Sequence, residues 1–203
     1  KWRLFEVPGC TKVRAVKVDN RNRVLAGGQG QIGYFSMQEN TFRFTSLVDQ
    51  LPANYPHVAE TWKIILHNGF TYFLTESQLL EFSDSSGIKV LDRPGYILNA
   101  HEAGGALYVQ IYDKGLFELI DHELVPIPAT DDIPYVIAVI PDGPGRYYFC
   151  SSGEVYRQGA EGLARIPVKV DMGTVNAVIR LNSGEYVFGT QNRGRYIFNP
   201  DLT

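Results

Sequence analysis

Short apolar runs alternate with turn-forming residues along the whole chain, and these runs recur in register. The most regular run contains an Ala or Ile at its centre, as in VRAVKV, WKIILH, ILNAHE, VIAVIP and VNAVIR. Its centres are separated by 49, 36, 38 and 39 residues, at Ala15, Ile64, Ala100, Ala138 and Ala177. A second apolar run follows each centre, in VLAGGQ, YFLTE, YVQIY, YFCSS and YVFGT. A period near 40 residues with several short strands in each repeat is typical of stacked β-propeller blades.

Each repeat fits four antiparallel strands, because residues that favour tight turns separate its apolar runs. The turn after the first strand reads DNRN, HNG, EAGG, DGPG or NSG in successive repeats. The last strand is short and polar, with Pro126, Pro128 and Pro167 nearby, as suits a sheet edge. The sequence therefore predicts an all-β single domain over residues 1–203, a β-propeller of about five four-stranded blades. The predicted blades span approximately residues 12–50, 61–92, 96–129, 134–170 and 174–203.

The two ends of the chain leave two readings of this propeller open. The segment KWRLFEVPG, residues 1–9, resembles the fourth strand of a blade without its first three, and the last repeat stops at FNPDLT. Either the N-terminal strand completes the last blade and closes a five-bladed ring, or the chain is an arc of a larger propeller. Because the chain lacks an initiator Met, we interpret it as an excerpt of a longer protein or as a processed product.

The composition excludes several classes of protein. A 44% apolar and 12% aromatic content is that of a folded domain with a substantial core. The net charge of −3 and the absence of a dense Lys/Arg run predict no nucleic-acid partner. No apolar stretch approaches the roughly 18 residues that span a bilayer, so no membrane segment is expected. The two cysteines, Cys10 and Cys150, are too few for a disulfide framework, and we expect free thiols.

One glycine motif suggests a cofactor but has a simpler explanation. Gly28, Gly30 and Gly33 form a Gly-x-Gly-x-x-Gly pattern after a strand. A dinucleotide site needs a helix at this point, whose amides hold the pyrophosphate. The residues that follow, YFSM, read as a strand instead, so we expect a turn and predict no cofactor.

Metal and catalytic residues give no clustered signal. The four histidines do not share the spacing of a metal site on one element, and no metal ion is predicted. Only His67 and His101 fall near equivalent positions of adjacent repeats. Carboxylates are scattered, and the sequence does not show whether two converge; they are Glu60, Glu76, Glu102, Asp113, Glu118, Asp131 and Asp132. We therefore predict that this chain is not an enzyme.

Three segments resemble a known family. The run VLAGGQGQIGYF, the WKI opening after a Pro-bearing loop and the strand KGLFELI are similar to periplasmic propeller repeats of bacterial one- and two-component sensors. In these regulator-propeller and triple-tyrosine proteins, two seven-bladed propellers precede an immunoglobulin-like domain, a membrane helix and a histidine kinase or helix-turn-helix output. The resemblance implies a periplasmic sensor module of a membrane-spanning regulator, with polysaccharide breakdown products as ligands and a homodimeric or partner propeller.

The sequence places a carbohydrate site at aromatic and polar residues near loop ends. Sugars stack on aromatic faces and bond to Asn and Arg, and binding sites concentrate on loops. The stretch from Gln38 to Thr61 is the longest irregular connection. The predicted ligand-binding residues are Tyr55, Trp62, Tyr96, Tyr112, Asn192 and Arg193. The leading hypothesis is a non-catalytic sensor; the alternatives are a propeller enzyme acting on a glycan or lactone and a protein-interaction scaffold.

Overall fold

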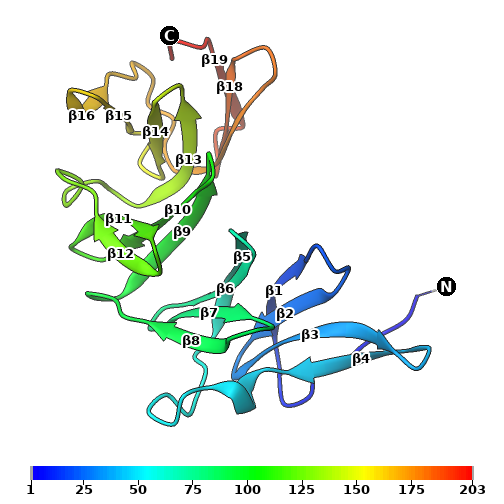
Figure 1. Cartoon of the computed structure of the whole chain (residues 1–203). Coiled ribbons are helices and arrows are strands. Elements are labelled where there is room, and N and C mark those ends of the chain that lie inside the picture. Colours follow the sequence, from blue (N-terminus) through cyan, green and yellow to red (C-terminus); the bar gives the residue numbers. More distant parts are fainter. Residues whose placement is uncertain (1, 203) are drawn as a thin grey trace. The chain divides into compact units, whose positions relative to one another are not determined.

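The computed structural model describes residues 2–202 and shows a nearly pure β architecture (Figure 1). Five antiparallel sheets follow one another along the chain, four with four strands and the last with three. The elements are β1 (Val13–Val18), β2 (Val24–Gly28), β3 (Gln31–Gln38), β4 (Thr41–Ser46), η1 (Val48–Gln50), β5 (Thr61–His67), β6 (Phe70–Thr75), β7 (Leu79–Ser83), β8 (Gly87–Leu91), β9 (Ile97–Ala103), β10 (Ala106–Ile111), β11 (Gly115–Ile120), β12 (Glu123–Pro126), β13 (Val136–Asp142), β14 (Gly145–Cys150), β15 (Val155–Gly159), β16 (Gly162–Ile166), β17 (Val175–Arg180), β18 (Tyr186–Thr190) and β19 (Arg195–Phe198). The sheets fall inside the five ranges expected from the repeats; Lys1 and Thr203 lie outside the described residues.

Each sheet is a meander whose turns follow from the residues between its strands. His67 pairs with Phe70 across a two-residue turn in which Asn68 and Gly69 have φ of 48° and 82°. Positive φ at both central residues defines the type I′ turn, which matches the twist of the flanking strands and favours Asn-Gly. In such a meander the first and third turns lie at the same end of the sheet, so side chains from those two turns are brought together.

A β-bulge recurs at the same place in four of the sheets. The register of the first strand shifts after its first residue, between Val13 and Ala15, Thr61 and Lys63, Val136 and Ala138, and Val175 and Ala177. A bulge increases the local twist and turns a side chain out of the regular ladder. The repeated bulge shows that the repeats share backbone detail beyond their apolar pattern.

The chain divides into two compact units, each with its own core. The first unit contains residues 1–97 and 121–123, and the second contains residues 98–120 and 124–203. In the first unit the fully buried side chains include Leu25, Phe73 and Leu80. In the second unit Phe149 lies 5.3 Å from Tyr186 and 5.5 Å from Phe188, measured between ring centroids.

The N-terminal segment does not form the expected strand. Residues 2–9 have no β-structure, and the fifth sheet contains β17, β18 and β19 alone among the described residues. Val7 instead packs against Ala26 and Phe35 of the first sheet, and the ring of Phe5 meets that of Phe42 edge-on at 5.0 Å. The prediction of a strand here was wrong: Val7 and Phe5 pack against side chains of the first sheet, while Trp2 and Leu4 remain exposed, so the segment joins no sheet edge.

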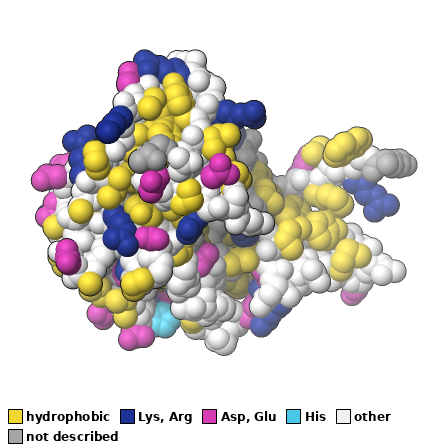
Figure 2. Space-filling model, turned by 90° about the horizontal axis from the view of Figure 1, so that it is seen from above, with side chains coloured by type: hydrophobic (Ala, Val, Ile, Leu, Met, Phe, Trp, Pro, Cys, Tyr) yellow, Lys and Arg dark blue, Asp and Glu magenta, His cyan; other side chains and the backbone are white. Residues whose placement is uncertain are grey.

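Charged side chains are mixed in sign on one face of the molecule (Figure 2). On the face seen in Figure 2, Lys and Arg are interspersed with Asp and Glu. No helix in the described residues is long and apolar enough to cross a membrane.

Candidate functional site

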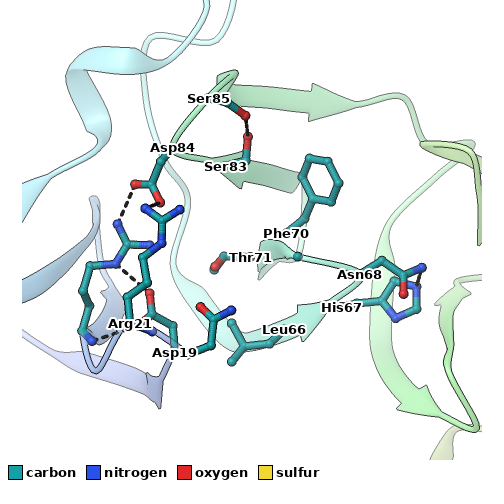
Figure 3. Close-up of a pocket in the computed structure, with 13 residues that line it drawn as sticks. Asp19, Arg21, Leu66, His67, Asn68, Phe70, Thr71, Ser83, Asp84 and Ser85 are labelled. Atoms are coloured by element: carbon teal, nitrogen blue, oxygen red, sulfur yellow. Dashed lines mark hydrogen bonds and ion pairs between the residues drawn. The ribbon is translucent and has the colours of Figure 1, made fainter.

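A pocket of the first unit opens between three turns (Figure 3). It has a volume of about 560 Å³ and is lined by the β1–β2 turn, the β5–β6 turn and the β7–β8 turn. These turns carry polar residues, because each sequence that favours a tight turn, DNRN, HNG and SDSS, is also rich in hydrogen-bonding groups. The volume is that of a small-molecule site.

A network of two arginines and two aspartates forms one wall of this pocket. Arg23 reaches both acids, with 2.6 Å from Nε to Asp19 Oδ2 and 2.6 Å from Nη1 to Asp84 Oδ1. Arg21 Nη1 contacts the other oxygen of Asp84, also at 2.6 Å. The guanidinium of Arg23 also lies 4.4 Å from the ring centroid of Tyr34, which fixes its plane. The four charges cancel, so this wall is polar without being strongly charged.

Asp19 is held in place by its own turn. The backbone N–H groups of Arg21 and Arg23 donate to Asp19 Oδ1 at 2.9 and 2.8 Å. Burial alone would raise the pKa of Asp19, but the hydrogen bonds from Arg23 and Arg21 outweigh it and lower that pKa. Burial would lower the pKa of Arg23, whereas its bonds to Asp84 and Asp19 raise it. Both groups are therefore held in their charged forms.

We expect this carboxylate to make stability fall in acid. Because the folded-state pKa of Asp19 lies below the ordinary value of 3.8, its ionised form stabilises the fold above that value. This contribution is lost as the pH falls through the lowered pKa. The free energy of unfolding of the wild type, measured in urea, should fall between about pH 4 and pH 2, and Asp19→Asn should show a flatter dependence. Parallel curves for the two proteins over this interval would contradict the assignment.

The opposite wall of the pocket combines a buried histidine with a partly buried ring. The amide Nδ2 of Asn68 donates to Nε2 of the buried His67 at 3.0 Å. Phe70 lies at the start of β6, and Ser83 and Ser85 face the pocket from the β7–β8 turn with their hydroxyls 3.1 Å apart. The pocket thus offers hydroxyl, amide, carboxylate and guanidinium groups beside one aromatic ring.

Phe70 packs against His122, which is itself bonded to the buried carboxylate of Glu81. The ring of His122 meets that of Phe70 edge-on at 5.0 Å, and its Nδ1 lies 2.7 Å from Oε2 of the buried Glu81. The hydroxyl of Tyr72 donates to the same oxygen at 2.8 Å. Burial and Glu81 together raise the pKa of Tyr72, so its hydroxyl remains a donor. The hydrogen bonds from Tyr72 and His122 satisfy the buried carboxylate of Glu81, and the contact with His122 holds the ring of Phe70 in position.

None of the residues predicted from the sequence lines this pocket. In the first unit, the guanidinium carbon of Arg14 lies over the ring of Trp62, 4.6 Å from the ring centroid. Nε of Arg14 also pairs with Oε1 of Glu60 at 2.7 Å. Tyr96 is exposed, and its ring centroid lies 5.9 Å from the guanidinium carbon of Arg93. Tyr55 lies in the long connection, where its backbone N–H donates to the carbonyl of Pro52.

The remaining three predicted residues belong to the second unit. Tyr112 is exposed in the β10–β11 turn, and Asn192 is exposed in the β18–β19 turn. Arg193 Nη1 binds the carbonyl of Asp171 at 2.6 Å and its Oδ2 at 2.9 Å. Arg193 thus fastens two segments of the second unit, and its guanidinium is already engaged.

Sequence reasoning missed the pocket residues, although it recognised two of the three turns, DNRN and HNG. The carboxylates that meet are Asp19 and Asp84, and neither was in the set considered from the sequence. The pattern that could have indicated this pocket is the presence of Asp and Arg in turns that lie at the same end of neighbouring sheets. Among the described residues, no group of three or more His, Cys, Asp or Glu side chains has the arrangement of a metal site.

The three glycines of the Gly-x-Gly-x-x-Gly pattern have structural explanations in the sheet. Gly30 has a φ of 70° in the turn between β2 and β3. A Cβ on Gly28 would lie 2.0 Å from the carbonyl oxygen of Lys12, and a Cβ on Gly33 would lie 2.2 Å from that of Thr45. Gly28 ends β2 and Gly33 lies within β3, so the motif leads into a strand rather than a helix, as the sequence predicts.

We expect Gly33→Ala to destabilise the first unit by about 1–3 kcal/mol, the range of an overpacked core. The added methyl group would overlap backbone as well as the ring of Phe44, and backbone in a sheet yields little. Gly30→Ala is the matched control, since no atom lies within 4 Å of its would-be Cβ and only its φ is unfavourable. Urea unfolding followed by tryptophan fluorescence compares the two, and equal losses would contradict the steric explanation.

The two thiols differ in environment, and we expect them to differ in reactivity. Cys150 is buried, and burial followed by the charge of Glu154 raises the pKa of its thiol to about 12. Cys10 is partly exposed, with its Sγ 3.0 Å from the carbonyl of Lys12. Since the thiolate is the reactive form, a disulfide reagent such as DTNB should label Cys10 in the native protein and Cys150 only after unfolding. Rapid labelling of both in the native state would contradict this.

Comparison with known proteins identifies the fold alone. No family model and no curated protein matches the sequence. A chain in the crystal structure of the mitotic checkpoint complex aligns with a TM-score of 0.65 at 11% identity, over 98% of this chain and 66% of that one. The computationally designed Ika8 protein aligns with a TM-score of 0.63 at 12% identity, over 94% of this chain and 59% of that one. Both similarities fit a β-propeller of about five blades, so the fold predicted from the repeats is confirmed.

Proposed function

We propose that this chain is a non-catalytic sensor module that binds a neutral carbohydrate in the pocket of the first unit. The observation that carries the proposal is the mutual neutralisation of Arg21, Arg23, Asp19 and Asp84 along one wall. An anion or a cation gains little from four charges that cancel. A polyhydroxylated molecule gains from them, because each of its hydroxyls both donates to a carboxylate and accepts from a guanidinium.

The other walls suit the same ligand class. The half-buried ring of Phe70 offers an apolar edge, while Asn68 and Ser85 offer exposed polar groups at the mouth. A pocket with few precisely placed polar groups and a hydrophobic contact is the usual form of a small-molecule site. The ligand class agrees with the family resemblance of the repeats, although the site lies at different residues from those predicted.

Binding is favoured over hydrolysis by the state of the acids. A glycoside hydrolase needs one carboxyl group that is protonated near neutral pH to act as the general acid. The hydrogen bonds to Asp19 lower its pKa, and Asp84 is tied to two arginines. The ionised carboxylate of Asp19 is a hydrogen-bond acceptor and not a general acid, which supports recognition of a sugar rather than cleavage of its linkage.

We further propose that the module is the extracytoplasmic, periplasmic part of a membrane-spanning regulator. This step rests on the resemblance of VLAGGQGQIGYF, WKI and KGLFELI to sensor propeller repeats. A ligand shifts such a receptor only by its differential affinity for two conformations. In the full-length protein, occupancy of the pocket would favour one packing against a partner propeller and so bias the output domain.

A thermal-shift screen with neutral oligosaccharides tests the proposed ligand class. Glucose-, galactose-, mannose- and xylose-based trisaccharides are added to the chain, and mass spectrometry follows each sugar. A ligand at 100 times its Kd stabilises the fold by about 2.7 kcal/mol, so a raised Tm without products is expected. Product formation would favour the enzyme alternative. Absence of any shift across the panel would contradict carbohydrate binding by this chain.

One surface favours a second function, that of a protein-interaction scaffold. Ile179, Val187 and Ile197 form a cross-strand row on the fifth sheet. Ile179 is 56% and Ile197 is 57% exposed, and exposed apolar rows mark interaction surfaces. Light scattering coupled to size exclusion should show self-association that Ile197→Glu weakens. A protein that remains monomeric over the accessible concentration range would count against the scaffold.

A further inference from the structure

The second unit has a small pocket of its own at the corresponding position of the repeat. It has a volume of about 240 Å³ and opens between the β9–β10 turn and the β13–β14 turn. These are the turns between the first and second strands of the third and fourth sheets, as the β1–β2 and β5–β6 turns are in the first and second. The volume is below the roughly 300–1,000 Å³ of drug-sized sites, so an occupant would be small.

Three polar side chains form the inner wall of this pocket. Tyr108 and Glu118 are directly opposed on β10 and β11. Arg146 Nη1 lies 3.2 Å from Oε2 of Glu118, and the guanidinium carbon lies 4.8 Å from the ring centroid of Tyr108. One positive and one negative charge cancel here, as the four charges do in the pocket of the first unit. Arg146 keeps further N–H donors beyond its bond to Glu118, and Glu118 keeps a second oxygen as an acceptor.

A buried hydroxyl lies in the cluster beneath the same wall. Tyr148 is opposed to Val139, which lines the pocket, and its side chain is on the same strand face as that of Arg146 two residues earlier. Its hydroxyl is one of three buried side-chain atoms without a hydrogen-bond partner in the described residues. Burial raises the pKa of Tyr148 to about 12, and Arg146 opposes that rise. This tyrosine is fully buried and does not itself line the pocket, so the site rests on Tyr108, Glu118 and Arg146.

The rim of this pocket is open at Gly143 and closely packed at Gly104. A Cβ on Gly143 would meet no atom within 4 Å, and Pro141 and Pro144 flank it. A Cβ on Gly104 would lie 3.0 Å from Cγ of Pro141, so this side of the rim is already close-packed. A ligand would therefore enter past Gly143 and reach Arg146 and Glu118.

We propose that this pocket is a second binding site, for one small neutral polyhydroxylated molecule the size of a single sugar ring. The ligand class rests on the function proposed above, whereas the site rests on the residues of the second unit alone. The hydroxyls of the ligand donate to Glu118 and accept from Arg146. Each unit then contributes one polar site, and the chain binds two sugar residues.

Site-resolved NMR tests this proposal on the whole chain. The amide spectrum of ¹⁵N-labelled protein is titrated with the methyl glycosides of glucose, galactose and mannose. We expect shifts at Gly104, Gly143 and Gly145 around the second pocket, in addition to Gly69 at the first. Glu118→Gln should weaken the affinity at the second pocket about tenfold, the effect of losing a charged acceptor, and leave Gly69 unaffected. Glu161→Gln, on an exposed turn, is the control.

Each outcome of the titration decides between the two proposals. Shifts at Gly69 alone would overturn the second site and leave the first intact. Shifts at the second rim alone would support the second site and contradict the pocket proposed for the first unit. Shifts at the second rim with sodium phosphate but with no glycoside would identify an anion site at Arg146 and overturn the ligand class. No shift at either rim with any glycoside would overturn both.

Discussion

Arg23→Met is expected to destabilise the first unit by about 3–5 kcal/mol, the usual cost of removing one partner from a buried ion pair. The side chain of Arg23 is 13% exposed and that of Asp19 is 4% exposed. The variant would leave Asp19 buried with only its two backbone donors, and Asp84 would keep Arg21 alone. Met fills a similar volume, so the loss reports the charge rather than a cavity.

Tryptophan fluorescence during urea unfolding measures this effect, because Trp2 and Trp62 both belong to the first unit. Arg21→Met is the matched control. Its side chain is 63% exposed, and an exposed ion pair contributes about 0–1 kcal/mol. If Arg23→Met and Arg21→Met lose the same free energy of unfolding, the network is a surface feature and Arg23 is not its centre.

Phe149→Ala is expected to cost the second unit about 3–5 kcal/mol, as large-to-small changes of buried Phe generally do. Phe149 is fully buried on β14, and its ring contacts those of Tyr186 and Phe188 on β18. Removing it leaves a cavity between the fourth and fifth sheets, whose packed rings have little room to collapse. The unfolding transition of the variant should therefore be less cooperative, because the packing between these two sheets is weakened.

Far-UV circular dichroism follows this change, since the second unit contains no tryptophan. Tyr112→Ala provides the comparison within the second unit, because Tyr112 is 57% exposed and surface substitutions usually stay within about 0.5 kcal/mol. A loss for Phe149→Ala no greater than that for Tyr112→Ala would show that the aromatic cluster does not hold these sheets together.

The repeats were predictable because each strand is determined by its own neighbours. A period of 36–39 residues, with Asn-Gly and Gly-Gly turns between apolar runs, fixes where strands begin and end. The sheets accordingly fall where the regular apolar runs placed them, with Ile64, Ala100, Ala138 and Ala177 each inside a first strand. The same local pattern explained why a strand, and not a helix, follows the glycine motif.

The convergence of side chains was not predictable in the same way. Asp19 and Asp84 are 65 positions apart and meet at Arg23 only because two separate sheets place their turns at the same end. The exposed aromatics Tyr55, Tyr96 and Tyr112 fit a sugar site by chemistry, but nothing local specifies whether they share a cavity. The N-terminal segment shows the same limit, since its apolar pattern suits a strand and a sheet-face cover equally well.

Calorimetric titration of the wild type and an Asn20→Ala, Ser85→Ala variant tests whether the pocket of the first unit binds carbohydrate. Both side chains are exposed at the mouth of the first pocket, outside the ion-pair network, and Asn182→Ala on an exposed turn of the second unit serves as control. The titrant is the trisaccharide that gives the largest thermal shift. We expect at least about a tenfold weaker Kd for the double variant, as for the loss of two hydrogen bonds, and no change for the control. An unchanged Kd in the double variant would contradict the assignment of this pocket as the carbohydrate site.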